Sequence, residues 1–411
     1  MRSILGVLAG GCALALLPSA ASAQTATTLL NFSANGGIEP YARMILDGRG
    51  NLYGETSTGG KPTALNPYPA GTVFELAPGS KKSGWTETVL YTFLGGADGS
   101  EPTGALLANS KGDLYGTTFL GGAQGDGTVF ELKKPKPGKK WKKRILYSFT
   151  GNDGSQPFAG LVADKAGDLF GVTTSGGQFN QGAVFEIQAR TLTESVLYSF
   201  FGPEGNTPNG GLVIDGAGNL YGTAAGSSVA PYAGSVFEIS PPAAGLSGWT
   251  FTQLHAFSGG ADGGAPQGAM VEDASGNLYG ATFGGTGLGN GTLFELSPSA
   301  GSPTGYGYQI LFTFDGSAGS NPFGDLVLDG SGNLWGSLVN NTDVNSSGGL
   351  FVVSPPAGGT GSWTQSASYL FNSSAGYSPY AGLTLDGEGN AYGVNFSGGK
   401  SGVGTAFKFV P

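Results

Sequence analysis

One pattern occurs seven times in this chain and constrains its fold more than any other feature. It reads Asp/Asn-x-x-Gly-Asn/Asp-Leu/Ala-aromatic-Gly, and successive copies begin 51 to 62 residues apart. The copies begin at Asp47, Asn109, Asp164, Asp215, Asp273, Asp329 and Asp386. A proline lies seven residues before each copy, at Pro40, Pro102, Pro157, Pro208, Pro266, Pro322 and Pro379. Such self-similarity indicates one supersecondary unit repeated along the chain.

Each repeat contains four strand-like runs rich in Val, Leu, Thr, Tyr and Phe and bounded by Gly, Pro, Asn or Asp. In the second repeat these runs are residues 104–108, 113–118, 128–132 and 142–149. The Asp-x-x-Gly-Asn link suits a tight turn, because its first side chain can accept backbone N–H groups and its glycine permits positive φ. A solenoid coil has fewer strands in a shorter repeat. Four antiparallel strands per repeat predict an all-β, seven-bladed β-propeller.

The two ends of the repeat region complement each other. Residues 27–32 resemble the fourth strand of a repeat, but no first three strands precede them. Residues 405–409 resemble the third strand of the last repeat, but no fourth strand follows them. We expect the N-terminal strand to join the last blade as its outer strand, which closes the ring and removes two exposed sheet edges. We therefore expect a single propeller domain over residues 24–411.

Residues 112–132 carry the phrase Gly-Asp-Leu-Tyr-Gly-Thr-Thr, then Gly-Gly, then Gly-Thr-Val-Phe-Glu-Leu. This phrase resembles the GloVer tandem repeat of secreted bacterial proteins, and the resemblance extends over residues 27–411. It is weaker in the sixth repeat, where Trp335 replaces Tyr and Val352 replaces Glu. The resemblance implies an extracellular propeller and no particular activity.

The N-terminus has the features of an export signal. Residues 1–23 combine a positive charge at Arg2, an apolar run over 4–17 that is too short to span a bilayer, and an A-x-A cleavage site at 21–23. We therefore expect a mature chain that begins at Gln24 and is secreted, into either the medium or the periplasm. No later run is apolar enough for a transmembrane segment.

Cysteine, charge and histidine restrict the chemistry. Cys12 is the only cysteine. A lipoprotein signal would usually have a leucine three residues before this cysteine, and this chain does not. If Cys12 is removed with the signal peptide, the mature chain has no cysteine for a disulfide or a thiolate ligand. Loss of Arg2 leaves 18 basic against 28 acidic residues, a net charge of −10, which disfavours nucleic-acid binding. His255, the only histidine, lies on a predicted outer strand, so we expect no catalytic triad, metal or cofactor there.

Function is expected where the repeats differ, because five equivalent glutamates in the Phe-Glu-Leu element cannot all be catalytic. The residue after each repeat proline varies: Tyr41, Thr103, Phe158, Asn209, Gln267, Phe323 and Tyr380. Two residues later the position holds Ala or Gly except at Arg43 and Asp325, which we predict approach each other at the channel mouth. The residue before the proline adds Glu39, Glu101, Gln156 and Asn321, and the loops between second and third strands add Tyr68, Phe119, Phe179, Tyr232, Phe283 and Phe396.

A ring of aromatic side chains with amides and carboxylates suits a sugar, because sugar faces stack on rings and hydroxyls need polar partners. The alternative is that these rings simply close the top of the core. We predict a non-enzymatic, monomeric binding module for a glycan or a surface protein. Its candidate ligand-binding residues are Glu39, Tyr41, Arg43, Glu101, Phe158, Phe323, Asp325 and Tyr380.

Two other functions remain open. A glycoside hydrolase or polysaccharide lyase could use carboxylates at the mouth, chosen from Glu39, Glu55, Glu101 and Asp325. An extracellular scaffold is the third possibility, since propellers host many functions. Separately, eight of the 19 basic residues lie between Lys133 and Arg144, in a predicted turn on the opposite face. This turn is either a solvated loop or a contact for an anionic polymer or lipopolysaccharide.

Overall fold

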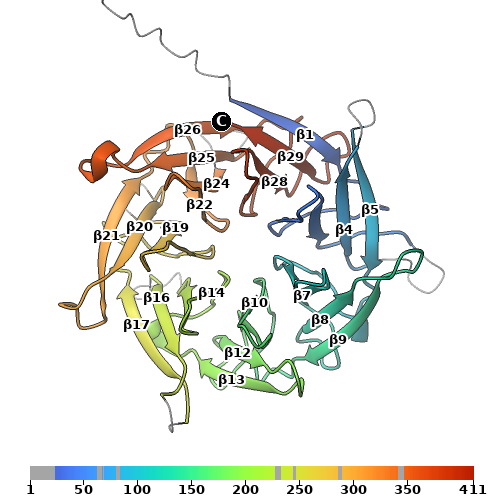
Figure 1. Ribbon diagram of the computed structural model, residues 1–411, viewed down its shortest axis with the longest axis horizontal. Helices are drawn as coiled ribbons and strands as arrows, with labels where there is room; N and C mark the ends of the chain where they lie inside the picture. The colour runs from blue at the N-terminus through green and yellow to red at the C-terminus, as the bar shows by residue number, and fades with distance from the viewer. Residues whose placement is uncertain are drawn as a thin grey trace, which may run out of the picture.

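The computed structural model describes residues 24–62, 67, 69–79, 84–226, 233–243, 247–285, 289–340 and 347–411. Their strands form seven antiparallel sheets arranged as blades around a central axis (Figure 1), which confirms the predicted seven-bladed propeller. The expected signal peptide, Tyr68 and Tyr232 lie outside the described residues. Across the part of the chain that is described, no helix has the length and apolar character needed to cross a membrane.

Within each blade the strands follow chain order from the axis outwards. Blade 1 contains β2 (Ile45–Leu46), β3 (Leu52–Thr56), β4 (Thr72–Pro78) and β5 (Trp85–Thr92). Blade 2 contains β6 (Leu107–Ala108), β7 (Leu114–Thr118), β8 (Thr128–Lys133) and β9 (Lys142–Ser148). Blade 3 contains β10 (Val162–Ala163), β11 (Leu169–Thr173), β12 (Ala183–Ile187) and β13 (Glu194–Ser199). Blade 4 contains β14 (Val213–Ile214), β15 (Leu220–Ala224), β16 (Ser235–Ser240) and β17 (Thr250–Ala256).

The remaining blades follow the same plan with two variations. Blade 5 contains β18 (Val271–Glu272), β19 (Leu278–Thr282), β20 (Thr292–Pro298) and β21 (Tyr306–Thr313). Blade 6 contains β23 (Val327–Leu328), β24 (Leu334–Asn340), β25 (Gly349–Ser354) and β26 (Thr364–Leu370), with an added strand β22 (Ser320–Pro322) on β24. Blade 7 contains β27 (Thr384–Leu385), β28 (Ala391–Asn395), β29 (Thr405–Val410) and β1 (Thr25–Asn31). Three short 3-10 turns lie in loops: η1 (Gly96–Asp98), η2 (Gly202–Glu204) and η3 (Ala357–Gly359).

Blade 7 joins the two ends of the described chain. Strand β1 pairs antiparallel with β29, from Thr25 opposite Val410 to Asn31 opposite Thr405, and the blue strand lies beside the dark red one (Figure 1). The predicted closure is therefore confirmed. The pairing covers the edge of β29, so the third strand of blade 7 has neighbours on both sides.

The repeated Asp-x-x-Gly-Asn motif forms the turn between the first two strands of each blade. In blade 1, Oδ1 of Asp47 accepts hydrogen bonds from the N–H groups of Arg49 at 2.8 Å and Asn51 at 2.9 Å. Burial acts to raise the pKa of Asp47, but these hydrogen bonds outweigh it and lower the pKa. All seven motif residues accept the same two backbone bonds. The turns thus cap hairpins, as the spacing predicts.

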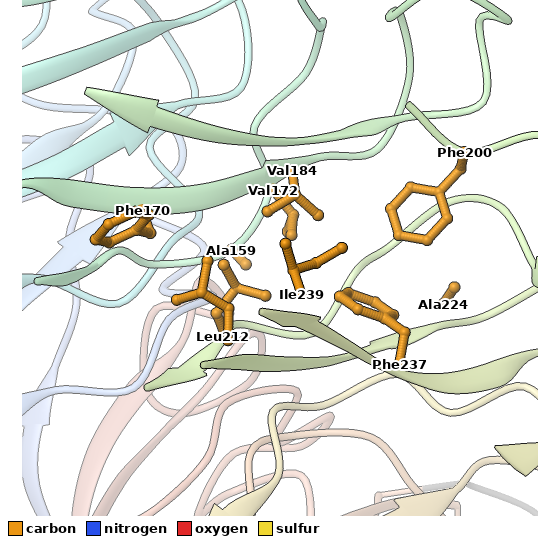
Figure 2. Close-up of a cluster of buried hydrophobic side chains, with 10 residues drawn as sticks. Ala159, Phe170, Val172, Val184, Phe200, Leu212, Ala224, Phe237 and Ile239 are labelled. Carbon is orange, nitrogen blue, oxygen red and sulfur yellow. The ribbon is translucent and has the colours of Figure 1, made fainter. Parts of the chain in front are cut away.

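The hydrophobic core lies between neighbouring blades. Between blades 3 and 4, for example, Phe170 and Val172 pack against Leu212, Phe237 and Ile239 (Figure 2). The phenylalanine of the third strand is fully buried in every blade, at Phe74, Phe130, Phe185, Phe237, Phe294, Phe351 and Phe407. Burial of each such side chain contributes roughly 1.5–3 kcal/mol to folding. Both faces of the middle strands are therefore buried, which is why they show no polar alternation.

The innermost strands are shorter than the sequence predicts. Residues 104–108 were expected to form a strand, but β6 includes only Leu107–Ala108. The preceding residues approach the axis and contact the next blade: a Cβ on Gly104 would lie 2.5 Å from the carbonyl oxygen of Ala159. Backbones this close leave room only for glycine or alanine at most positions beside the channel. The residues before β6 therefore pack against blade 3 and do not pair with β7.

A left-handed residue links each blade to the one before it. The seven residues that precede the repeat prolines have φ between 52° and 62°, although none is glycine. They are Glu39, Glu101, Gln156, Thr207, Ala265, Asn321 and Ser378. Each donates its N–H to a carbonyl in a loop of the preceding blade, as Glu101 does to Ala70 at 3.0 Å. These hydrogen bonds offset a conformational cost of about 1–2 kcal/mol per residue.

Candidate functional site

Loops at one end of the blades surround the mouth of the central channel. Each blade places the residue after its repeat proline at this mouth. A cavity of about 360 Å³ extends from there along the axis, lined by these residues and by the innermost segments of the blades. Because the backbones at the axis are so close, the side chains at the mouth determine what can enter.

Aromatic rings from four blades contact one another on one side of the mouth. The ring centroid of Tyr41 lies 5.1 Å from that of Phe158 in an edge contact and 5.2 Å from that of Tyr380 in a stacked one. Phe323 lies 5.2 Å from Tyr380 and 6.3 Å from Tyr41. These four residues, which we call the aromatic platform, come from blades 1, 3, 6 and 7 and all line the cavity.

Loops between second and third strands add a second row of rings behind the platform. Phe119 lies 6.0 Å from Phe158, Phe283 lies 6.1 Å from Phe323, and Phe396 lies 5.8 Å from Tyr41. Phe179, predicted to join them, is instead 47% exposed and pairs with Phe201 away from the platform. The second row fixes the orientation of the platform rings through edge contacts.

Burial strongly affects the phenol at the centre of the platform. It raises the pKa of Tyr41 far above its usual value, and the nearby Tyr380 raises it further. The hydroxyl of Tyr41 therefore stays protonated over the physiological range. It can offer a ligand a neutral donor and acceptor but not a base.

Polar side chains from the other three blades complete the mouth. Nδ2 of Asn209 donates to Oε1 of Gln267 at 2.7 Å, which joins blades 4 and 5. On blade 2, Oγ1 of Thr103 donates to the carbonyl of Phe158 at 3.1 Å. Asn209, Gln267 and Thr103 all line the cavity. The mouth therefore combines the aromatic platform with a pair of amides on blades 4 and 5, and Thr103 of blade 2 lies between Tyr41 and Phe158 in the order of the ring.

An ion pair lies deeper along the axis. Nε of Arg43 is 3.8 Å from Oδ2 of Asp325, with side-chain exposures of 37% and 27%. The structure thus brings together the two charges that the sequence predicts to meet. Oδ1 of Asp325 accepts the N–H of Ala269 at 2.9 Å, whereas Nε of Arg43 is buried and has no hydrogen-bond partner among the described residues. Both side chains also line a second hollow of about 400 Å³ that continues towards the opposite end.

The other predicted carboxylates do not line the cavity. The carboxylate of Glu39 accepts a hydrogen bond from Thr58 at 3.2 Å, and neither Glu39 nor Glu101 is among the lining residues. Glu55, a candidate carboxylate for the mouth, is only 1% exposed. It follows Tyr53 on the face of β3 that packs against blade 2, and burial raises its pKa well above the usual value.

The single histidine has structural contacts. His255 stacks on Tyr308 with centroids 3.8 Å apart, and its Nε2 lies 3.4 Å from Oδ2 of Asp262. Burial lowers the pKa of His255, against the opposing effect of Asp262. Over the described ranges, no group of three or more His, Cys, Asp or Glu residues is arranged to hold a metal ion.

A family model matches nearly the whole chain in three overlapping stretches, residues 15–230, 136–351 and 195–407. The chain belongs to the Gloeobacter/Verrucomicrobia repeat family. This membership confirms the resemblance seen in residues 112–132. A comparison of this Gloeobacter/Verrucomicrobia repeat protein with curated proteins finds no match.

A comparison with solved structures finds matches at low sequence identity. PorZ, an essential bacterial surface component of the type-IX secretion system of Porphyromonas gingivalis, matches with a TM-score of 0.52 and 14% identity, over 89% of this chain and 46% of PorZ. The chain therefore spans less than half of PorZ. A luciferin-regenerating enzyme matches with a TM-score of 0.46 and 15% identity, over 80% of this chain and 95% of the enzyme. A putative gluconolactonase matches with a TM-score of 0.43 and 13% identity, over 81% of this chain and 92% of that one. The likeness to PorZ shows the fold alone.

The candidate site also includes Asn209 and Gln267, which are not among the ligand-binding residues predicted from the sequence. Asn209 and Gln267 occupy the same position after the proline as the platform residues, yet only the aromatic and charged members were selected. The sequence feature that indicates these two residues is a polar side chain at the same position in two adjacent repeats. Their mutual hydrogen bond depends on the spacing between blades 4 and 5, which no local pattern encodes.

Proposed function

We propose that this protein is an exported propeller that binds a glycan at the channel mouth. One observation carries the proposal: the aromatic platform and the Asn209–Gln267 amides lie around a single cavity. Sugar rings present apolar C–H faces that stack on aromatic rings, and hydroxyl edges that need paired donors and acceptors. The aromatic platform and the amides of blades 4 and 5 supply these two kinds of contact.

The deeper ion pair adds a polar contact to this arrangement. Nε of Arg43 lies 3.8 Å from Oδ2 of Asp325 but has no hydrogen-bond partner among the described residues, and the carboxylate of Asp325 is held in place by the N–H of Ala269. A ligand hydroxyl or ring oxygen could accept from Arg43. The cavity, at about 360 Å³, is within the range of small-ligand pockets, roughly 300–1,000 Å³.

Binding is favoured over hydrolysis or lyase chemistry by the same geometry. A glycoside hydrolase needs two carboxylates on either side of the scissile bond. Of the four carboxylates considered, only Asp325 lines the cavity, and it is already paired with Arg43. The structure offers no observation that favours a scaffold role over glycan binding.

A glycan-array screen on the mature protein, followed by calorimetry on each hit, tests the proposal. We expect Asn209→Ala combined with Gln267→Ala to weaken binding at least about fivefold, because each loses a hydrogen bond to a sugar hydroxyl. Gln178→Ala is the matched control, since Gln178 is exposed on the same face. Binding that is equal in the mouth variant and the control would contradict the proposal, and product formation from any hit would favour an enzyme instead.

Export is the second part of the proposal. We expect a mature N-terminus at Gln24, because residues 21–23 form an A-x-A cleavage site. N-terminal sequencing of protein from the periplasm or medium checks this. A lipid-modified start at Cys12 would replace secretion with membrane anchoring.

A further inference from the structure

The turn between β8 and β9 concentrates positive charge in an acidic protein. Residues 133–144 contain eight of the 19 basic residues and no acidic one. Without Arg2, the rest of the mature chain therefore has 10 basic against 28 acidic residues, a net charge of −18. The equivalent turns of blades 4, 5 and 6, residues 241–248, 299–305 and 355–362, contain no charged residue. The links between the third and fourth strands of blades 1 and 3, residues 79–84 and 188–193, contain three basic residues in all, Lys81, Lys82 and Arg190. The dense positive charge is thus a property of the blade 2 hairpin and not of the repeat.

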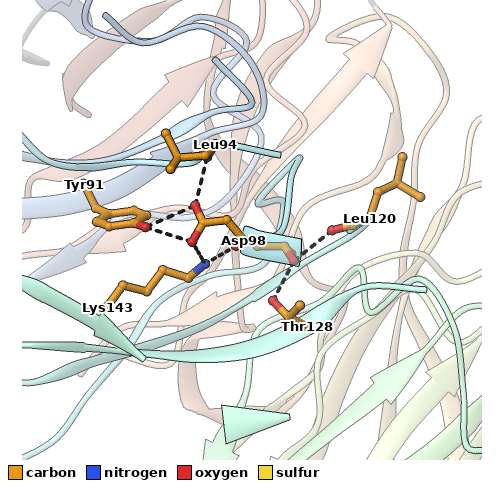
Figure 3. A network of polar contacts seen from close by, with 7 residues as sticks. Tyr91, Leu94, Asp98, Leu120, Thr128 and Lys143 are labelled. Atoms are coloured by element: carbon orange, nitrogen blue, oxygen red, sulfur yellow. Dashed lines mark hydrogen bonds and ion pairs between the residues drawn. The ribbon is translucent and has the colours of Figure 1, made fainter. Parts of the chain in front are cut away.

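Two of the eight basic side chains form ion pairs with residues outside the turn. Nζ of Lys143 is 3.0 Å from Oδ1 of Asp98 (Figure 3). It also lies 4.7 Å from the centre of the Phe93 ring. Nη2 of Arg144 is 3.2 Å from Oε2 of Glu131. These two residues, with Trp141 packed against the core between blades 1 and 2, anchor the base of the hairpin.

The other six cations face solvent. They are Lys133, Lys134, Lys136, Lys139, Lys140 and Lys142, and all are exposed. None of the six forms an ion pair with a described acidic side chain. Lys133 stands directly opposite Lys142 in the strand register, and like charges at facing positions destabilise a hairpin. A bound anion would relieve this repulsion.

We propose that this hairpin binds a linear, polyanionic polysaccharide. The six exposed lysines provide charge complementarity, and a thin chain can reach the hairpin alone. A flat anionic membrane would also face the remaining surface, whose net charge of −18 repels it. The exposed side chains of the turn include no large apolar residue that could insert into a bilayer, so a membrane fits less well than a soluble chain.

The position of the hairpin separates this site from the channel mouth. In an antiparallel blade, the turn between the third and fourth strands lies at the end opposite the loops that form the mouth. A polysaccharide at the hairpin therefore leaves the mouth accessible. This inference is independent of glycan binding at the mouth.

Affinity electrophoresis and calorimetry of the mature protein with alginate, a linear polyuronate, test the proposal, with neutral dextran as the uncharged comparison. Replacement of Lys133, Lys134, Lys140 and Lys142 by Gln should weaken alginate binding on the order of 100-fold, because binding rests on neutralised charges. Replacement of Lys61 and Lys400 by Gln removes charge from exposed loops at the channel-mouth end and should leave binding nearly unchanged. Binding should also fall steeply as salt increases.

A second measurement separates binding from folding. The hairpin variant should keep or slightly raise its Tm, because it removes the repulsion between Lys133 and Lys142. Equal losses in both variants, or equal binding to dextran, would overturn the proposal. Binding to phosphatidylglycerol vesicles without binding to alginate would overturn it in favour of a membrane surface.

Discussion

Each residue before a repeat proline adopts a strained, left-handed backbone conformation. Ala265 has φ of 52° and its N–H donates to Ala233 at 2.7 Å, so the backbone of the preceding blade holds it there. An alanine in this region is strained by about 1–2 kcal/mol, whereas glycine and asparagine adopt it more readily. The side chain can vary at this position because the contact between blades uses the backbone.

Substitution of Ala265 measures this cost. We expect Ala265→Asn to raise the free energy of unfolding by about 0.5–1 kcal/mol, because asparagine tolerates the left-handed region. Ala108→Gly, on exposed strand β6 with no positive φ, should instead destabilise the protein through backbone entropy. Urea denaturation of both variants checks the opposite signs. A loss of stability in Ala265→Asn would show that the blade contacts do not impose strain there.

Glu194 predicts a pH effect on stability. Burial, followed by the charge of Asp153, raises the pKa of Glu194 from 4.5 to about 7, against an opposing hydrogen bond from Tyr147. The folded chain therefore binds more protons than the unfolded chain between these values, so stability falls as pH rises through this window and levels off above it.

Melting curves of the wild type and Glu194→Gln isolate this group. The Tm of Glu194→Gln relative to the wild type should increase as pH rises from about 4.5 to about 7, because only the wild type pays for ionising a buried carboxyl. Glu388→Gln, at an exposed turn position, is the control. A difference in Tm that is independent of pH would mean that Glu194 is ionised in the folded state throughout.

At the scale of the element, strand β1 decides whether the ring is closed. It covers β29, and the chain that follows it contributes Phe32, which is fully buried against blades 1 and 7. Deletion of residues 24–33 should lower stability by at least the roughly 3 kcal/mol from Phe32 burial. It should also expose the edge of β29 and promote association between chains.

Light scattering and melting curves check the deletion. Addition of a peptide of residues 24–33 should restore the monomer and part of the Tm, which distinguishes loss of an edge strand from general misfolding. A truncated protein that stays monomeric with an unchanged Tm would exclude β1 as the closing strand.

At the scale of the whole molecule, the ion pair at the axis has two possible roles: part of a ligand site or a structural plug. Arg43 and Asp325 come from blades 1 and 6 and meet only because the ring is closed. If they contact the glycan, Arg43→Ala and Asp325→Asn should each reduce affinity roughly tenfold. The effect on Tm should be small, because a partly exposed pair contributes about 0–1 kcal/mol.

Asp325→Asn is the sharper variant, because an amide oxygen can still accept the N–H of Ala269. Calorimetry with a hit from the glycan array and melting curves of both variants make the comparison. Reduced Tm with unchanged affinity would identify the pair as a plug of the channel.

Much of the architecture was predictable because it rests on short-range chemistry. Asp47 accepts from Asn51 only four residues later, so each turn is encoded within its own repeat. The number of blades and the closing strand follow from counting these local units. The meeting of Arg43 with Asp325 was also predictable, because both occupy the same position of an innermost segment.

Only the tertiary structure determined which side chains meet around the ring. Both faces of β3 are buried between blades, so no alternation in the sequence shows that Glu55 lies between blades 1 and 2 and not at the mouth. Likewise, Asn209 and Gln267 are 58 residues apart in the chain, and Tyr41 reaches Phe158 from two blades away. Local patterns set the turns and strands, whereas contacts between blades depend on the distance and tilt at which the closed ring packs them.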